Sequence, residues 1–144
     1  MNLDFASVWE MISDIVPEND ALICGDEIIS WKDYDLQSSK IATALKNAGL
    51  GPNSKAGLYL NNSNEYLIGQ NAIFKIGGVP INVNYRYVAE ELIYLLDNSD
   101  SEAIFYHACY SSRIKEISGS LPNIKAWIEI ADGTKSGFED SLKF

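Results

Sequence analysis

The chain has 144 residues, of which 47% are apolar, so it fits one domain with a sizeable core and does not resemble a disordered segment. Its net charge of -9, without any cluster of Lys and Arg, argues against a nucleic-acid surface but leaves room for a local site that binds a small polyanion. No apolar run approaches the ~20 residues of a membrane helix, and acidic Asp4 and Glu10 stand where a signal peptide would be basic, so we expect a cytoplasmic protein without a membrane span.

The first part of the chain predicts a helix, a hairpin and a second helix. Residues 5–17 repeat apolar side chains at helical spacing and end in a proline. Residues 21–24 and 28–31 are short strand-like runs, and the Gly-Asp-Glu sequence between them has the turn chemistry of a hairpin. An apolar stripe along residues 34–48 then predicts a helix that stops at Gly49.

The middle of the chain begins a series of alternating strands and helices. Residues 55–60 are typical of a buried strand, and Asn62 or Ser63 can cap a helix that carries residues 66–74. The glycine pair at 77–78 supplies a left-handed stop for that helix. These signals predict a strand and a helix joined by a short connection.

Residues 79–83 predict a further short strand, in which Pro80 stands near the first position, where a missing N–H is tolerated. The polar loop 84–87 follows, and in a parallel sheet it lies at the carboxyl end of the strand, where open α/β sheets bind ligands. Residues 88–97 then predict a helix with Leu, Ile and Leu on its buried side and two glutamates near its positive N-terminus.

The last third continues the alternation. Residues 102–106 predict a strand, Ser111 or Ser112 is placed to cap a short helix, and residues 126–130 form the last clear strand. Residues 133–144 are mostly polar and predict a short helix that packs poorly. The fold class predicted from these elements is α/β, with a mainly parallel, doubly wound sheet and flanking helices.

The run that starts at Phe74 reads K-x-G-x-V-P-x-N-x-N-Y-R-Y-x-x-x-E-L-x-Y-L-L from its second residue. It resembles the N-terminal region of adenylate-forming acyl-CoA synthetases, the AMP-binding superfamily, and within it the fatty-acyl and related carboxylate–CoA ligases. Residues 34–49 are similar to the first long helix of that family, and residues 55–66 to the strand and helix start that follow it. The resemblance covers nearly the whole chain, from about Phe5 onward.

The resemblance implies an enzyme that uses ATP, Mg²⁺ and CoA to convert a small-molecule carboxylate into its CoA thioester through an acyl-adenylate. In the family, the phosphate loop, the magnesium ligand, the ribose-binding Asp and the mobile C-terminal domain all lie downstream of the matched region. We therefore expect residues 1–144 to be a single incomplete domain that packs against the remainder of the synthetase. We expect no catalytic residue and no metal ligand among them, no tightly bound cofactor and no activity of the chain alone.

Arg86 is the one cofactor-binding candidate that the resemblance carries over. In some carboxylate–CoA ligases an Arg at the corresponding place contacts the phosphates at the nucleotide end of CoA, and a guanidinium suits phosphate geometry. The alternative is a loop Arg that pairs with a nearby glutamate or caps a carbonyl. Asn82 and Asn84 are expected to orient this loop through backbone hydrogen bonds, and Tyr85 and Tyr87 either stack on an adenine or cover the sheet end.

Other residues are weaker candidates for a catalytic or binding role. Gly133-Thr134-Lys135-Ser136-Gly137 is the one superficial phosphate-loop candidate, and a surface turn is the better interpretation. His107, the sole histidine, is expected to be a polar residue at a strand end and not a general base. Cys24 and Cys109 lack metal spacing, which predicts reduced and mostly buried thiols.

Three functions stay open at this point. The first is the N-terminal fragment of an acyl-CoA synthetase, and the second is a non-enzymatic α/β binding or interaction module left by truncation. The third is an unrelated doubly wound nucleotide-binding protein, which needs a glycine-rich turn near the N-terminus, where only Gly25 is present.

Overall fold

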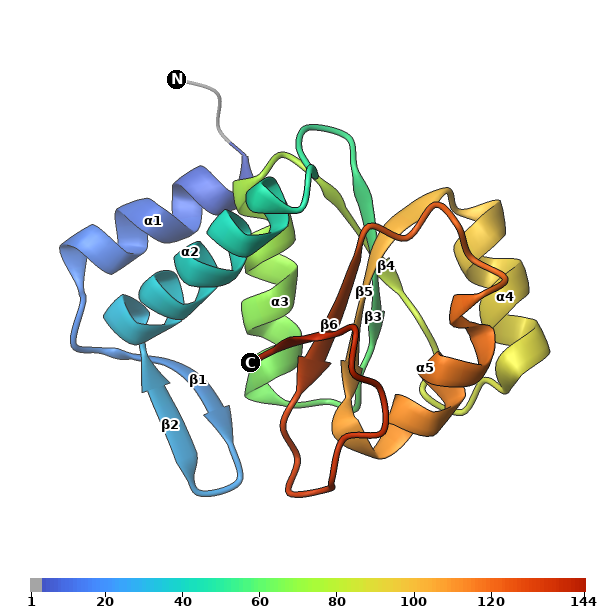
Figure 1. Cartoon of the computed structure of the whole chain (residues 1–144). Helices are drawn as coiled ribbons and strands as arrows, with labels where there is room; N and C mark the ends of the chain where they lie inside the picture. Colours follow the sequence, from blue (N-terminus) through green and yellow to red (C-terminus); the bar gives the residue numbers. More distant parts are fainter. Residues whose placement is uncertain (1–3) are drawn as a thin grey trace.

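The computed structural model describes residues 4–144, in which a parallel sheet carries helices on both faces and a hairpin stands beside it (Figure 1). This arrangement confirms the predicted α/β class with a mainly parallel, doubly wound sheet. In chain order the elements are α1 (Phe5–Ile15), β1 (Asp20–Cys24), β2 (Glu27–Ser30), α2 (Trp31–Asn47), β3 (Lys55–Tyr59), α3 (Asn64–Lys75), β4 (Val79–Asn82), α4 (Ala89–Asn98), β5 (Ser101–His107), the 3-10 turn η1 (Ala108–Tyr110), α5 (Ser111–Ser118), β6 (Ala126–Ile130) and β7 (Leu142–Lys143).

The five-stranded sheet has the order β4-β3-β5-β6-β7, and every neighbouring pair is parallel. Pro80 lies in the edge strand β4, as expected for a residue that cannot donate to a ladder. Helix α3 packs on one face of the sheet, and α4 and α5 pack on the other (Figure 1). Because the helices after the adjacent strands β3 and β5 lie on opposite faces, the topological switch point falls at the carboxyl ends of these two strands.

Two hydrophobic clusters hold the layers together. The first joins the hairpin, α2 and α3 to one face of the sheet, and the second joins α4 and α5 to the other. Leu45, Leu58, Ile104 and Ile114 are completely buried within these clusters. Each such side chain contributes roughly 1.5–3 kcal/mol through the apolar surface that it removes from water.

The helix ends follow the local sequence. The Ser63 hydroxyl accepts a hydrogen bond from the Tyr66 N–H at 3.3 Å, so Ser63, and not Asn62, caps α3. Gly77 has a φ of +72°, and the Gly78 N–H donates to the Ile73 carbonyl at 2.9 Å. This is the left-handed stop that the glycine pair predicts.

Two predicted details of the C-terminal third are wrong. Residues 133–144 contain no helix, since Phe138 is buried with its ring edge-on to Trp127 at 5.6 Å and Leu142–Lys143 form the strand β7 beside β6. Neither Ser111 nor Ser112 caps α5, because the helix begins at Ser111 and its hydroxyl accepts instead from the Gly137 N–H at 2.8 Å. Both differences arise because the segment after β6 folds back onto the sheet and α5.

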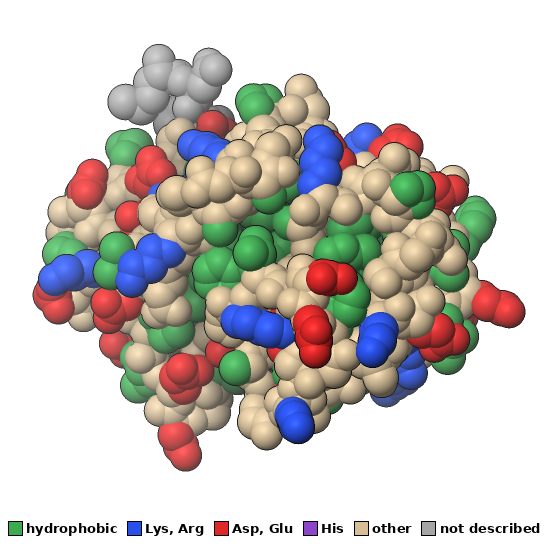
Figure 2. Space-filling view, viewed as in Figure 1, with side chains coloured by type: hydrophobic (Ala, Val, Ile, Leu, Met, Phe, Trp, Pro, Cys, Tyr) green, Lys and Arg blue, Asp and Glu red, His purple; other side chains and the backbone are tan. Residues whose placement is uncertain are grey.

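The surface combines scattered charges with an apolar hollow. Figure 2 shows apolar side chains gathered in the middle of one face, where α2, α3 and β6 meet. A cavity at this junction is lined by Ile41, Ile68, Ile130 and Phe144, among others. No helix within residues 4–144 is both long and apolar enough to cross a bilayer.

Candidate functional site

The loops at the carboxyl ends of the parallel strands form the candidate site, which we call the carboxyl edge. It consists of residues 60–63 after β3, 83–88 after β4, 108–110 after β5 and 131–132 after β6. The chain direction of the strands brings these loops to one side of the sheet (Figure 1). Ligands of open α/β sheets bind at this side, next to the switch point.

The loop 84–87 is held by short backbone contacts. The Asn84 side-chain oxygen accepts from the Arg86 N–H at 3.0 Å, and the Tyr87 N–H donates to the Asn84 carbonyl at 3.0 Å. Asn84 therefore orients the loop as predicted. Asn82 does not, because its side-chain oxygen accepts from the Tyr66 hydroxyl at 3.0 Å.

The Arg86 side chain is exposed at the tip of this loop. Its guanidinium carbon lies 5.5 Å from the centre of the Tyr85 ring, a cation–π contact. Among residues 4–144 no carboxylate lies within 4.0 Å of the Arg86 guanidinium, and Glu91 instead accepts from the Val88 N–H at 2.9 Å. The neighbouring glutamates leave the positive charge of Arg86 unpaired. Tyr87 is partly buried against the second cluster and so covers the sheet end.

A cluster that sequence reasoning missed stands between the strand ends. The Tyr59 ring packs 4.6 Å from the Tyr110 ring, and the Tyr110 hydroxyl donates to the Asn61 side chain at 3.1 Å. Arg113 donates to both the Tyr59 hydroxyl and the Tyr87 carbonyl. The signal that could have identified this cluster was the position of Arg113 in the first turn of the helix that follows β5.

His107 ends β5, as predicted, and the structure places it at the switch point. It is buried, and its Nδ1 accepts from the Asn61 N–H at 3.3 Å. Desolvation lowers the pKa of His107, and the more distant Asp132 and Glu65 carboxylates only partly oppose this shift. The ring is thus held neutral as a hydrogen-bond acceptor that links the ends of β3 and β5.

We expect His107 to make the free energy of unfolding depend on pH. Because its pKa is lowered on folding, its contribution is complete above the ordinary value of 6.5 and is lost as the pH falls below it. In H107N the Asn side chain keeps an acceptor near the Nδ1 position and cannot titrate. Urea unfolding at pH 7.5 and 5.5 should show a larger loss for the wild-type chain than for H107N, and equal losses would contradict the assignment.

The two cysteines are free thiols, but both are exposed, so the expectation of buried thiols was wrong. Cys24 is the last residue of β1, and Cys109 lies in the 3-10 turn η1 after β5. Desolvation and the nearby Asp132 carboxylate raise the pKa of Cys109 to about 11. A thiol with this pKa stays protonated at neutral pH and is a poor nucleophile.

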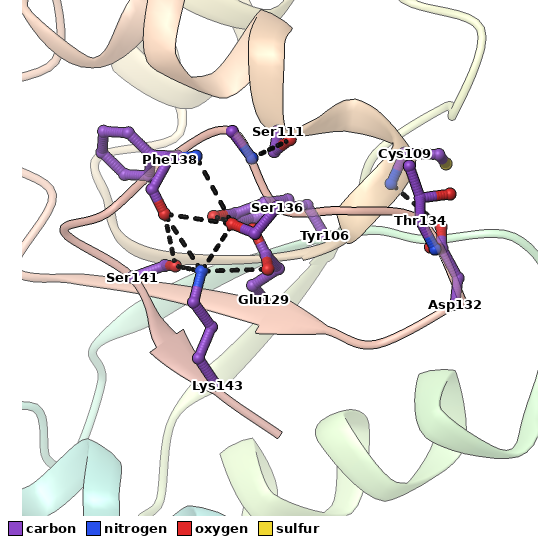
Figure 3. Close-up of polar contacts among 11 residues, drawn as sticks. Tyr106, Cys109, Ser111, Glu129, Asp132, Thr134, Ser136, Phe138, Ser141 and Lys143 are labelled. Atoms are coloured by element: carbon purple, nitrogen blue, oxygen red, sulfur yellow. Dashed lines mark hydrogen bonds and ion pairs between the residues drawn. The ribbon is translucent and has the colours of Figure 1, made fainter.

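The glycine-containing segment 133–137 is a turn and not a phosphate cradle (Figure 3). Two of its N–H groups already have protein partners, since the Thr134 N–H donates to Asp132 at 2.9 Å and the Gly137 N–H donates to Ser111. Desolvation alone would raise the pKa of Asp132, but the hydrogen bonds from Cys109 and Thr134 outweigh it and hold that pKa well below its usual range. A carboxylate charged in this way repels phosphate.

A second polar network, centred on Glu129 of β6, holds the same segment against the sheet. Glu129 of β6 is buried, and its carboxylate accepts from the Ser136 hydroxyl at 2.7 Å, the Tyr106 hydroxyl at 3.2 Å and the Lys143 ammonium at 2.9 Å (Figure 3). Lys143 also donates to the Phe138 carbonyl at 3.0 Å. The signal in the sequence was a single charged residue within an otherwise apolar strand.

CoA and Mg²⁺, two of the cofactors that the resemblance implies, fit these residues differently. An unpaired, exposed guanidinium at a strand end suits a phosphate of CoA. Among residues 4–144 no three His, Cys, Asp or Glu side chains are grouped to hold a metal ion. The part of the chain that the structure describes therefore presents one exposed, unpaired guanidinium at the carboxyl edge.

Comparison with known proteins gives consistent matches over almost the whole chain. A family model described as AMP-binding enzyme matches residues 13–143. A medium/long-chain-fatty-acid–CoA/3-oxocholest-4-en-26-oate–CoA ligase from Mycobacterium marinum is 37% identical over 136 residues, which cover 94% of this chain and 25% of the relative. A 3-oxocholest-4-en-26-oate–CoA ligase from Rhodococcus rhodochrous is 35% identical over 138 residues, covering 96% of this chain and 25% of the relative.

Solved structures share the fold. Coronafacic acid ligase from Pectobacterium brasiliense superposes with a TM-score of 0.80 and 19% identity, over 98% of this chain and 28% of that protein. This likeness extends through the parallel sheet and the helices on both of its faces. The chain spans about a quarter of the length of the curated relatives that it matches.

Proposed function

Because this chain belongs to the AMP-binding enzyme family, we propose that it forms the N-terminal portion of an ATP-dependent carboxylate–CoA ligase. The observation that carries the proposal is the match at 37% identity over 94% of the chain to an acyl-CoA ligase. In the proposed reaction the carboxylate attacks the α-phosphorus of ATP, and pyrophosphate leaves. The CoA thiol then attacks the acyl carbon, releases AMP and forms the thioester.

The residues of this chain contribute scaffold and one contact. The parallel sheet and the two clusters fix the carboxyl edge, and the loop 84–87 presents Arg86 there. In this proposal Arg86 binds a phosphate at the nucleotide end of CoA, and CoA supplies the acyl-accepting thiol. The unpaired state of Arg86 supports this role, because no ion pair has to be broken when the phosphate binds.

The names of the relatives suggest the substrate class. Both curated relatives act on acids that are largely apolar, either fatty acids or a sterol side-chain acid. We propose a medium- or long-chain fatty acid, or an acid of comparable apolar bulk, as the substrate. Activation of short polar acids only would contradict this part of the proposal.

The test compares the 144-residue chain with the product of the reading frame that contains it, including any codons after Phe144. Each protein is incubated with ATP, Mg²⁺, CoA and a panel of acids from acetate to palmitate and a sterol side-chain acid. We expect the longer product to form acyl-CoA, AMP and pyrophosphate, and the 144-residue chain alone to release none. If the longer product forms no acyl-CoA, the ligase proposal is wrong.

A non-enzymatic binding module is the second candidate, and the site itself provides a reason to consider it. Residues 4–144 hold no metal-ligand group, and the one glycine-rich segment is closed by its own hydrogen bonds. Robust pyrophosphate release by the chain alone would refute this module function. A reading frame that stops after Phe144 and yields no activity would favour it.

Arg86→Met is expected to weaken CoA use by the whole ligase. Loss of a charge-assisted hydrogen bond to phosphate costs about 1.5–3 kcal/mol, which corresponds to a roughly tenfold or larger increase in the KM for CoA. The adenylation step, measured as ATP–pyrophosphate exchange without CoA, should not change. R86K should recover part of the loss, whereas a KM for CoA that stays within twofold of the wild type in R86M would remove Arg86 from the site.

A further inference from the structure

The carbonyl of Tyr87 is the point where three elements meet. It accepts a hydrogen bond from the Tyr59 hydroxyl at 3.0 Å and a second from the Arg113 guanidinium at 2.9 Å. Arg113 uses the same nitrogen to donate to the Tyr59 hydroxyl. The last residue of the loop 84–87 is thus bound by β3 and α5 together, although neither is its neighbour in sequence.

Both donors belong to rigid parts of the fold. Tyr59 is completely buried, and its ring packs against Tyr110 of η1. Arg113 is half-buried on α5, one residue before the completely buried Ile114. The two hydrogen bonds to the Tyr87 carbonyl therefore hold the loop in place relative to the sheet and to α5.

The other hydrogen bonds of the loop are local. Its internal bonds join Asn84 to Arg86 and Tyr87, and its exit is fixed by Glu91, which accepts from the Val88 N–H. These contacts are local and lie within eight residues, so they shape the turn but do not place it against the sheet. The bonds to the Tyr87 carbonyl supply that placement, together with the packing of the Tyr87 side chain against the second cluster.

We infer that Arg113 is a positioning residue for the loop 84–87 and that it orients Arg86 toward an anionic group at the carboxyl edge. Arg113 acts through the Tyr87 carbonyl, one residue after Arg86, and does not itself contact the anion in this scheme. The ligand, a phosphate of CoA, rests on the proposed function. The positioning role of Arg113 rests on its contacts with Tyr59 and Tyr87 and not on the identity of the ligand.

The experiment measures amide hydrogen exchange by NMR in the 144-residue chain. The variant Arg113→Met removes the guanidinium and keeps most of the side-chain volume. A hydrogen bond from a charged donor is worth about 1.5–3 kcal/mol, so the amides of Arg86, Tyr87 and Val88 should exchange about tenfold faster or more. The matched control is Lys115→Met, which removes an exposed positive charge from the same helix and should leave these amides unchanged.

Two further variants separate positioning from general loss of stability. R113K keeps the charge and one donor and should restore part of the protection. Y59F leaves the Arg113 bond to the Tyr87 carbonyl in place, so it should have a smaller effect than R113M. If exchange at residues 86–88 in R113M stays within twofold of K115M, or if the amides of β5 accelerate equally, the positioning role is overturned.

A binding measurement distinguishes this inference from the proposed function. Calorimetry with adenosine 3′,5′-bisphosphate, which carries phosphates like those at the nucleotide end of CoA, is run on the wild-type chain, R86M and R113M. Weaker binding in both variants supports the whole scheme. Faster exchange in R113M together with unchanged affinity in R86M confirms the positioning of the loop and contradicts the CoA contact, and the same holds if the wild-type chain does not bind the probe.

Discussion

Lys143→Met is expected to lower the free energy of unfolding by about 3 kcal/mol, because it leaves a buried carboxylate without its counter-charge. Glu129 is only 4% exposed, and Lys143 is its cationic partner in an ion pair of 2.9 Å. The ammonium also donates to Ser136 at 2.7 Å and to the Phe138 carbonyl and Ser141 (Figure 3). Its removal therefore also loosens the segment that covers the end of the sheet.

The double variant E129Q/K143M provides the test of this explanation. A neutral Gln can still accept from Tyr106 or Ser136, so removal of both charges should restore most of the stability that K143M loses. Urea unfolding of the wild type, both single variants and the double variant completes the cycle. Lys135→Met, which removes an exposed Lys of the same segment, is the control and should change stability by less than about 0.5 kcal/mol. A double variant less stable than K143M would contradict the buried-charge explanation.

Lys75→Met should destabilise the chain by about 2 kcal/mol. The Lys75 side chain is only 7% exposed and pairs with Glu10 of α1 and, at 2.7 Å, with Asp35 of α2. It therefore joins the three N-terminal helices, and its loss leaves two carboxylates facing each other. We expect less than the full cost of a broken buried pair, because Glu10 is 52% and Asp35 32% exposed and both can be hydrated.

Variants that neutralise one carboxylate at a time should lose stability to different degrees. Glu10→Gln should cost about 0.5 kcal/mol and Asp35→Asn about 1 kcal/mol, in the order of their exposure. Desolvation opposes the charge of Lys75, but the bonds to Asp35 and Glu10 outweigh it and raise its pKa above 10.5. The stability that Lys75 contributes is therefore complete at neutral pH and is lost only as the pH rises through its raised pKa. If thermal unfolding gives equal losses for K75M and E10Q, the Lys75 bridge has no special role.

Most elements could be predicted from the sequence because their signals are local. Ser63, Gly77 and Gly25 mark ends and turns through their own side chain or backbone freedom, and the structure has a cap, a stop and a turn there. Pro80 was expected near the first position of a short strand, and it is the second residue of β4. The prediction of a helix in residues 133–144 was wrong, because the polar side chains of this segment find their hydrogen-bond partners only after the chain folds back onto Glu129.

The candidate site was predictable only in part. Arg86 and Asn84 lie in one turn, so their relation follows from sequence separation. Arg113 and Tyr59 are 54 residues apart, and no pattern along the chain indicates that both bind the Tyr87 carbonyl. Expectations about exposure failed in the same way, since Cys24 and Cys109 have apolar neighbours in sequence but lie at the surface.

The order of α-helices and strands from α1 to β6, the parallel class of the sheet and the family resemblance follow from the sequence alone, because periodicity, caps and motif wording depend on residues that are near one another. The contacts between distant polar groups, such as Lys143 with Glu129 and Arg113 with the Tyr87 carbonyl, become visible in the three-dimensional fold alone. Such pairs depend on strand order and on the face that each helix covers. A hydrogen bond requires its two atoms to lie within about 3 Å, and sequence spacing does not determine that distance once the chain crosses from one strand to another.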